Sequence, residues 1–519
     1  MARHISSRLK ITGELVAETP LHVGGYGESF ETDLALARNG KDEFYIPGTS
    51  LTGALRGWFE KNFPNDVNDL WGFQIGDQGH ASFVLIEDLM LPEQVQSELR
   101  DGVGIDRFYG TAADKGKFDR AILPKGTRLK LEMTVDMQGN ENKVKPMFRS
   151  LLEALQNGQI RLGASKTRGL GKVKCGQIGI EEWSLYDPKD ILDAVEKKPT
   201  NKYQINNLKG TQANGPQLLT MTIGWKPKSP VMVKAAYEGI GVDTLPLSSG
   251  NGKNKVSLCL PGSSIKGAFR AHAERIMRTL LDCPDQEERY RTKNKQNFHD
   301  QIKKIPLIDE LFGAKKERTG QAKHLGLGAL SIDDCYAKTL DANIWSEVEA
   351  GEMKDDKTYS TQPLWKALKK IEGDNKADTT NFKISHHVAI DRWTGGSAEG
   401  ALYSVLQPTA AIDWDEICLT LDLSRLRGAG VAPDETLKKR CLMLLLLVLR
   451  GLAENRLPLG FAANRGMGEV IIEKIEGLSE IPKLLGLEGE SFEAEIKSGT
   501  MTFKGDKVKE KLKEVWAYE

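Results

Sequence analysis

The stretch IPGTSLTGALR at residues 46–56 returns as LPGSSIKGAFR at residues 260–270. Both copies keep a Pro-Gly pair, a Ser two residues after that Gly, a Gly-Ala pair and a closing Arg. A match of this length points to a duplicated unit, because a fixed internal period is the mark of a repeat architecture. If the whole unit is duplicated, further echoes must follow in the same order.

Further echoes do follow in that order. PLHVGG at 20–25 corresponds to PVMVKA at 230–235, and GASKTRGLGKV at 163–173 corresponds to GFAANRGMGEV at 460–470. Three more pairs lie between them: LWG (70–72) with LFG (311–313), VLIEDL (84–89) with LSIDDC (330–335), and GIDRFYGTAADKG (104–116) with AIDRWTGGSAEG (389–400). We therefore predict two homologous domains, at 1–194 and 218–475, with a linker at 195–217 and a C-terminal extension at 476–519.

The second copy is longer than the first, which locates two insertions near residues 275–305 and 336–388. Within the first insertion, residues 289–304 carry six Lys or Arg side chains against one Asp. This basic stretch suits contact with RNA or with a neighbouring subunit, and it equally suits a solvated loop.

Composition indicates a soluble globular protein, with 39% hydrophobic and 28% charged residues among 519. The 72 basic and 72 acidic side chains cancel, so any surface that binds nucleic acid has to be local. Six scattered cysteines without a C-x-x-C pair favour reduced thiols in the cytoplasm. The longest apolar run, CLMLLLLVL at 441–449, is too short to span a bilayer, so we expect no membrane association.

The duplicated Pro-Gly stretch predicts a turn followed by a helix. Ser50 and Ser264 stand where an N-cap is expected, and apolar residues recur behind each at helical spacing. The start of such a helix presents backbone N–H groups that suit a phosphate, although an ordinary capped helix with a solvated Arg would look the same. The predicted RNA-binding residues here are Ser50, Thr52, Arg56, Ser264, Lys266 and Arg270.

The late glycine motif has the spacing G-x-x-x-x-R-G-x-G-x-V in both copies. A dinucleotide site is excluded, because an apolar helix precedes these glycines and a strand follows them. The loop suits close approach of a sugar-phosphate chain, or else a turn that needs positive φ angles. The predicted RNA-binding residues are Lys166, Arg168, Gly169, Gly171, Arg465, Gly466 and Gly468.

The order strand, helix, strands, helix, strand predicts an α+β fold. Each copy reads as a ferredoxin-like split βαβ unit, the scaffold that RNA-recognition domains also use.

These motifs in combination resemble the RAMP superfamily of CRISPR-associated proteins, and among them the backbone subunits of type III effector complexes. Two such units in one chain look like the fused backbone subunit of a III-D-like complex. The resemblance implies ferredoxin-like domains with thumb-type insertions. It also implies four partners: a guide CRISPR RNA, a complementary target RNA, other RAMP backbone subunits and the large subunit of the complex.

The resemblance further implies that a loop aspartate cleaves the target RNA with a divalent metal, Mg²⁺ or Mn²⁺. By position, the matching residues are Asp33 in SFETDLALAR and Asp243 in GIGVDTLPL, which are thus the predicted catalytic and metal-binding residues. Such a carboxylate can act as a base towards the 2′-hydroxyl, or hold a metal that neutralises charge on the phosphate. A loop Asp can also simply form a turn.

Two alternatives remain open at this stage: a non-catalytic RNA-binding scaffold, and a metal-independent nuclease that processes the guide. The second would use histidine, yet His22 is replaced by Met232 in the other copy, and His386 and His387 occur only in copy two. The segments after IDR suggest a base wedge or thumb-adjacent site, formed by Arg107, Phe108, Arg392 and Trp393.

Overall fold

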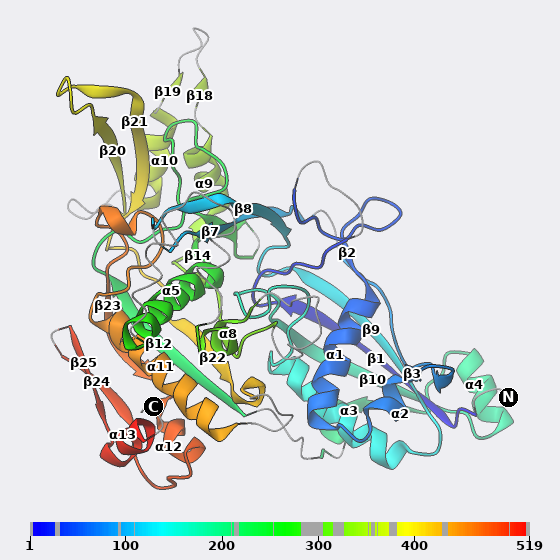
Figure 1. Ribbon diagram of the computed structural model, residues 1–519. Helices are drawn as coiled ribbons and strands as arrows, with labels where there is room; N and C mark the ends of the chain where they lie inside the picture. The colour runs from blue at the N-terminus through cyan, green and yellow to red at the C-terminus, as the bar shows by residue number, and fades with distance from the viewer. Residues whose placement is uncertain are drawn as a thin grey trace. The chain divides into compact units, whose positions relative to one another are not determined.

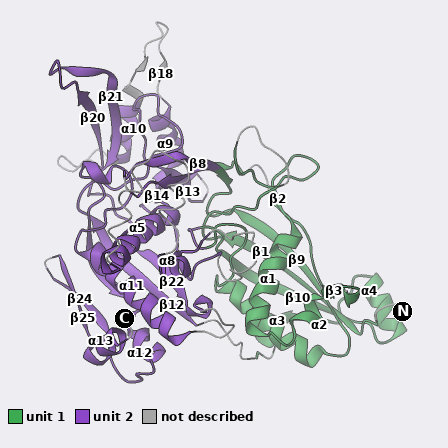
Figure 2. Cartoon of the chain, in the orientation of Figure 1, with its two compact units in different colours: residues 1–99, 120–166, 170–216 green, residues 100–119, 167–169, 217–519 purple. Residues whose placement is uncertain are grey.

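The computed structural model describes residues 4–25, 32–91, 95–107, 109–208, 210–211, 217–252, 254–281, 305–314, 326–350, 352–353, 359–360, 362–372, 381–427, 434–497 and 499–514. The chain forms two compact units, which Figure 2 shows in green and purple. Unit 1 contains residues 1–99, 120–166 and 170–216, and unit 2 contains residues 100–119, 167–169 and 217–519.

Unit 1 is built on an antiparallel sheet with the strand order β11-β10-β1-β9-β5. Alternating apolar residues bury one side of β9, from Leu129 to Met137, as a half-buried strand requires. Helix α1 follows β1 and helix α3 precedes β10, and Phe59 of α1 packs against Phe148 of α3. The elements are β1 (Ser7–Ala17), α1 (Gly48–Asn62), β5 (Val84–Ile86), β9 (Arg128–Met137), α3 (Glu141–Gln156), β10 (Val173–Ser184) and β11 (Asn201–Gln204).

Unit 2 repeats the same plan, with the strand order β15-β22-β12-β23 and helices α5 and α11 in the corresponding places (Figure 1). Taken in chain order, both sheets run second, third, first, fourth, which is the ferredoxin-like order with one extra strand, β11, in unit 1. The predicted α+β fold of two tandem ferredoxin-like domains is thereby confirmed. The elements are β12 (Leu218–Pro227), α5 (Gly262–Leu280), β15 (Leu330–Ile332), β22 (Ile417–Asp422), α11 (Glu435–Ala453) and β23 (Val470–Glu476).

Each repeat also carries a long β-hairpin. In the first it joins β7 (Glu98–Ile105) to β8 (Ala112–Ile122), and in the second it joins β20 (Phe382–Ile390) to β21 (Ser397–Pro408). Figure 1 shows the β20–β21 hairpin projecting from the body of unit 2, as a thumb-type insertion would.

Parts of the first repeat belong to unit 2. Residues 100–119 of the first hairpin and residues 167–169 of the glycine loop are among them. Arg100 Nη1 donates to Asp334 Oδ2 at 2.9 Å, and Arg107 Nε donates to Glu274 Oε2 at 2.7 Å. The second ferredoxin-like domain is therefore completed by segments from the first copy of the sequence.

The interval 195–217, expected to be a linker, contributes structure to unit 1. Strand β11 pairs with β10 along Gly179–Glu182, and Ile205 and Leu208 are buried in the core. The expectation rested on the absence of apolar periodicity in this interval. A short edge strand followed by a single helical turn is too short to show such a periodicity.

The C-terminal extension packs on the second domain. Phe492, Met501, Val508 and Leu512 are buried in the core that contains β12 and α11. Its elements are α12 (Ile481–Leu484), β24 (Glu493–Lys497), β25 (Thr500–Lys504) and α13 (Asp506–Lys513).

The two insertions differ in what the structure shows of them. The basic stretch 289–304 lies outside the described residues. The insertion at 336–388 contains α9 (Ala342–Glu349) and α10 (Gln362–Glu372), which form a small core with Phe382 and Leu406 at the base of the β20–β21 hairpin. Val242 and Leu245 belong to the same core, so the loop that carries Asp243 is anchored on both sides.

The remaining elements are short. The five described cysteines are free, and none of the helices in the described ranges is long and apolar enough to cross a membrane. These elements are β2 (Tyr45–Ile46), α2 (Val67–Trp71), β3 (Phe73–Ile75), β4 (Gln78–His80), β6 (Leu89–Met90), α4 (Pro188–Val195), η1 (Ile205–Asn207), β13 (Ser248–Gly250), β14 (Lys255–Leu260), α8 (Ile308–Phe312), β16 (Cys335–Tyr336), β17 (Leu340–Asp341), β18 (Glu352–Met353), β19 (Tyr359–Ser360), η2 (Leu423–Arg425), η3 (Ala463–Arg465) and η4 (Leu478–Glu480).

Candidate nucleic-acid interface and cleavage sites

The duplicated helices begin three residues earlier than the sequence suggested, with Pro47 and Pro261 at the N-cap positions. Helices α1 and α5 start at Gly48 and Gly262, so the predicted N-cap role of Ser50 and Ser264 is wrong. Distant carboxylates occupy the helix starts instead. Asp88 Oδ1 accepts a hydrogen bond from the Gly48 N–H at 2.7 Å, and Asp334 Oδ1 accepts one from the Gly262 N–H at 2.8 Å.

This arrangement changes where RNA can lie. The carboxylate at each helix start takes the first backbone N–H and places negative charge where a phosphate would otherwise bind. Contact with an RNA backbone is therefore favoured along the flank of the helix rather than at its end. In the sequence, these two carboxylates were indicated only by the similarity between VLIEDL, which contains Asp88, and LSIDDC, which contains Asp334.

The two glycine loops have matching backbones. The Leu162 N–H donates to the Gly171 carbonyl at 2.7 Å, and the Leu459 N–H donates to the Gly468 carbonyl at 2.9 Å. Gly171 and Gly468 have φ angles of 92° and 91°, a region that favours glycine. A Cβ on Gly171 would collide with the carbonyl oxygen of Leu162, and a Cβ on Gly468 would collide with that of Leu459. These two glycines are required by the turn itself.

Gly169 and Gly466 also have positive φ angles, but their surroundings differ. A Cβ on Gly169 would collide with the carboxylate of Asp334, whereas nothing lies close to the equivalent atom at Gly466. The glycine motif of the first repeat is therefore fixed by a close approach to α5 within unit 2 as well as by its own turn.

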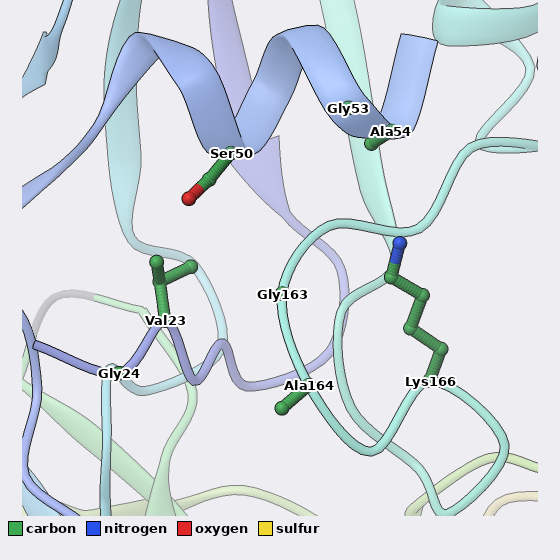
Figure 3. Close-up of a pocket in the computed structure, with 8 residues that line it drawn as sticks. All are labelled: Val23, Gly24, Ser50, Gly53, Ala54, Gly163, Ala164 and Lys166. Carbon is green, nitrogen blue, oxygen red and sulfur yellow. The ribbon is translucent and has the colours of Figure 1, made fainter. Parts of the chain in front are cut away.

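Unit 1 has a pocket of about 340 Å³ between the flank of α1 and the glycine loop (Figure 3). In that view the Lys166 side chain extends from the loop towards the turn of α1 that carries Gly53 and Ala54. Small residues and one cation suit close approach of a sugar-phosphate chain. The pocket is lined by Val23, Gly24, Ser50, Gly53, Ala54, Gly163, Ala164 and Lys166.

The second repeat places its cation differently. Ala463 stands where Lys166 is expected, while Lys234 stands where the first repeat has Gly24. The bridges Gly24–Leu36 and Lys234–Pro246 show that these two positions are equivalent in the fold. Sequence reasoning missed Lys234, although the pairing of PLHVGG with PVMVKA already contained it.

Arg270 is committed to contacts inside unit 2. It donates to Glu274 at 2.8 Å, to the Gly313 carbonyl at 2.6 Å and to Asp309 at 3.2 Å, which holds α5 against α8. Its counterpart Arg56 donates to Asn68 of α2 at 3.4 Å. Both arginines connect their own helix to a neighbouring helix, so they are placed to stabilise helix packing more than to bind phosphate.

Two further predicted contacts also face inwards. Thr52 Oγ1 donates to the Gly48 carbonyl at 2.8 Å, within its own helix. The Lys266 ammonium is buried and donates to the Leu330 carbonyl at 2.6 Å. Burial, followed by the nearby cations Arg168, Arg270 and Arg425, lowers the pKa of Lys266 to about 7. Arg168 itself is exposed.

The two predicted catalytic aspartates occupy equivalent positions. Leu34 bridges Arg120 in a parallel arrangement, and Thr244 bridges Val405 in the same way, so Asp33 and Asp243 each precede a bridging residue. Both are exposed on loops. The intervals from these aspartates to the next Pro-Gly differ in length, but the bridges fix the correspondence directly.

Asp243 is held by Ser404 of β21. The Ser404 hydroxyl and backbone N–H donate to Asp243 Oδ2 at 2.7 Å and 2.6 Å. These hydrogen bonds hold the pKa of Asp243 below its usual range, with His386 contributing electrostatically.

The remaining predicted residues fall into three groups. Arg107 pairs with Glu274, and Phe108 lies outside the described residues. Arg392 and Trp393 stand at the tip of the β20–β21 hairpin, where Trp393 is 95% exposed. Arg465 lies over the ring of Tyr403 at 5.6 Å and donates to its hydroxyl.

His22, the candidate acid or base of a processing nuclease, is buried in unit 1. Its Nδ1 lies 2.7 Å from the Ala121 carbonyl, and burial lowers its pKa. A buried histidine bonded to a backbone carbonyl is placed to support the fold, which weakens the guide-processing alternative.

Within the described part of the chain, no donor set formed by protein side chains alone matches the predicted divalent metal. In the ranges that the structure describes, no group of three or more His, Cys, Asp or Glu side chains could hold a metal ion. Asp243 offers one carboxylate, of which Oδ2 already accepts two hydrogen bonds. These residues do not form a metal centre by themselves.

The sequence matches the family model of the RAMP superfamily over residues 14–174 and 228–471. The two matched regions coincide with the two repeats and together make up well over half of the chain. No curated protein matches the chain.

Proposed function

Since the chain belongs to the RAMP superfamily of CRISPR-associated RNA-binding proteins, we propose that it is the fused backbone subunit of a type III, III-D-like effector complex. Each of its two domains binds the guide CRISPR RNA, and the complex cleaves complementary target RNA beside Asp33 and Asp243. Its partners are the two RNAs, other RAMP backbone subunits and the large subunit of the complex.

The equivalent placement of Asp33 and Asp243 carries this proposal. The two residues precede matching bridges in the two repeats, and both side chains are exposed. A duplicated site on one chain would make two cuts in one bound RNA. The pocket beside Lys166 supports guide binding in the first repeat, and Lys234 supplies the cation in the second.

The chemistry that this site has to supply is modest. The target RNA brings its own nucleophile, the 2′-hydroxyl, and the protein has to bend the backbone so that attack on phosphorus is in line. A carboxylate beside the 2′-hydroxyl can accept its proton. Mg²⁺ or Mn²⁺, as proposed for this reaction, would neutralise charge on the phosphate and would take most of its ligands from RNA and water.

The test is cleavage of an end-labelled complementary RNA by the assembled complex, with Asp33→Asn, Asp243→Asn and the double variant. We expect each single variant to lose one discrete cut by roughly 100-fold or more, with guide binding unchanged. Asp42→Asn, an exposed loop aspartate paired with Arg38, is the matched control.

Omission of the metal forms a second arm of this experiment. Chelation by EDTA should abolish the cuts if the metal proposal holds. An unchanged cut pattern in the double variant would leave the chain as a non-catalytic scaffold, and the chemistry would then belong to another subunit.

A further inference from the structure

Asp243 and His386 flank one residue, Ser404, at the base of the β20–β21 hairpin in unit 2. Asp243 is bound to Ser404 through three hydrogen bonds, because the Asp243 N–H also donates to Ser404 Oγ, at 3.1 Å. On the other side, the antiparallel register of the hairpin pairs His386 directly with Ser404. Strand β21 therefore runs between the aspartate and the histidine.

The histidine lies on the same face of the hairpin as Ser404. Directly paired residues of an antiparallel ladder project to the same side, and their neighbours project to the opposite side. The neighbouring pair, His387 and Tyr403, forms a ring stack on that opposite side with centroids 5.2 Å apart. His386 and Asp243 are exposed, while Ser404 is buried. The small serine therefore lies below and between these two ionisable side chains.

The two side chains are close enough to act on one phosphodiester. Asp243 is hydrogen-bonded to Ser404, and the Cβ atoms of directly opposed residues such as His386 and Ser404 lie about 4.5–5.5 Å apart in an antiparallel pair. In-line displacement at phosphorus needs the attacking and leaving oxygens on opposite sides of the phosphorus atom. A base and an acid on either side of Ser404 match that requirement.

We propose that His386 is a further catalytic residue of the second cleavage site and protonates the leaving oxygen. This inference rests on the proposed function. The 2′-oxygen bonds to phosphorus as its proton passes to the Asp243 carboxylate, and the bond from phosphorus to the 5′-oxygen breaks as that oxygen takes a proton from the imidazolium of His386. The products are a 2′,3′-cyclic phosphate and a 5′-hydroxyl, and proton exchange with water returns both side chains to their starting states.

The environment of Asp243 explains why an acid matters at this site. Its hydrogen bonds to Ser404 keep the carboxylate ionised but make it a weak base. Assistance to the leaving group then carries a larger share of the rate acceleration.

The first repeat is built differently at these positions. Matching the two IDR motifs places Asp101 where the second repeat has His386. The equivalent bridges of Arg120 and Val405 place Asp119 where the second repeat has Ser404. Asp101 pairs with Lys117 at 2.9 Å. An ionised carboxylate cannot donate a proton, so the effect of His386 is confined to the second cut.

The test uses the assembled complex and a complementary RNA that reports both cuts. We expect His386→Gln to slow the second cut by roughly 100-fold or more and to leave the first cut unchanged. His387→Gln is the matched control, because it alters the adjacent histidine on the opposite face of the same strand. An unchanged second cut in His386→Gln would overturn the inference.

A modified substrate separates a proton donor from a structural residue. When sulfur replaces the bridging 5′-oxygen at the second cut, the thiolate leaves without being protonated. His386→Gln should therefore cleave this RNA within a few-fold of the unsubstituted protein. A variant that stays slow on the sulfur substrate would also overturn the inference, since His386 would then only support the site.

Asp243→Asn keeps the two proposals distinguishable. If Asp243→Asn leaves the second cut intact, the proposed function of this site fails. If Asp243→Asn abolishes the cut while His386→Gln does not, only the role of His386 fails.

Discussion

At the scale of single residues, Lys266 shows how burial overrides local sequence. The sequence placed it in the first turn of a phosphate-binding helix, but its ammonium points into unit 2 and donates to the Leu330 carbonyl at 2.6 Å. Desolvation is the main cause of its lowered pKa, and three arginines add to it. The residue thus links the stability of unit 2 to pH.

We predict that Lys266→Met flattens the dependence of the unfolding free energy on pH. The folded pKa is about 7 against an ordinary value of 10.5, so the unfolded chain binds the proton more tightly between these limits. Stability should therefore rise with pH across this window, by up to about 1.4 kcal/mol per pH unit, and change little from this group below it. Urea unfolding at several pH values measures the slope.

The exposed Lys226, which pairs with Glu473 at 2.6 Å, provides the control for this experiment. Lys226→Met should keep the slope of the parent protein. The same slope in Lys266→Met would show that Lys266 is not the titrating group.

The sequence could predict the positions of single residues where two copies could be compared. The match of Asp33 with Asp243 came from counting along the repeat, and the bridges of Leu34 and Thr244 agree with it. The carboxylate caps from Asp88 and Asp334 were not predicted, because each reaches its helix start from a distant segment. Local capping preferences carry no information on such a partner.

At the scale of elements, the β20–β21 hairpin combines a fixed base with an apolar tip. Asp391 Oδ1 accepts a hydrogen bond from the Trp393 N–H at 2.7 Å and so holds the turn. Trp393 is 95% exposed, and Ile390 and Leu402 are 57% and 68% exposed. Exposed apolar side chains gathered on one element indicate a surface that binds a partner.

We predict that Trp393→Ala weakens binding of the target RNA to the assembled complex without destabilising the chain. Stacking of one base on an aromatic ring contributes about 1–3 kcal/mol, so the dissociation constant should rise roughly tenfold. The melting temperature should stay unchanged, because the side chain makes few contacts in the folded protein. Filter binding and thermal unfolding measure the two effects.

Trp365→Ala is the matched control, since Trp365 is 51% exposed on α10 of the same insertion. It should bind RNA as the parent protein does. Equal binding by both tryptophan variants would rule out a base wedge at the hairpin tip.

Patterns in the sequence predicted these elements but not the unit to which they belong. The two IDR motifs indicated matching segments near a thumb-type insertion, and the ferredoxin-like fold followed from the succession of strands and helices. That residues 100–119 belong to unit 2 depends on contacts such as that between Arg100 and Asp334, which are 234 residues apart. Hydrophobic periodicity indicates local structure and gives no information on contacts between residues so far apart in the sequence.

At the scale of the whole molecule, unit 2 draws on both copies of the sequence. The side chains of Arg100 and Asp334 are 9% and 0% exposed, so their ion pair is buried. Removing one partner of a buried pair leaves an uncompensated charge, which costs about 3–5 kcal/mol. The first repeat therefore stabilises the second directly.

We predict that Arg100→Met lowers the unfolding free energy of unit 2 by about 3–5 kcal/mol. Adding Asp334→Asn should recover part of the loss, because a neutral amide needs no cation beside it. Hydrogen exchange across β12, β22 and β23 reports on unit 2 within the full chain.

Arg8→Met tests an exposed pair for comparison, since the Arg8 side chain is 44% exposed beside Asp136. It should cost no more than about 1 kcal/mol. A similar cost for the Arg8 and Arg100 variants would show that burial of the second pair does not matter.

The contact between Arg100 and Asp334 can form only after the ribosome has synthesised both residues. Its two residues are 234 positions apart, so at ~5–20 residues per second the ribosome adds the later one roughly 10–50 s after the earlier one. Through that interval Arg100 lacks its carboxylate partner, and the strands of the nascent hairpin are open to chaperones or to incorrect pairing. Slower translation would lengthen the wait, and the yield of folded chain should fall with it.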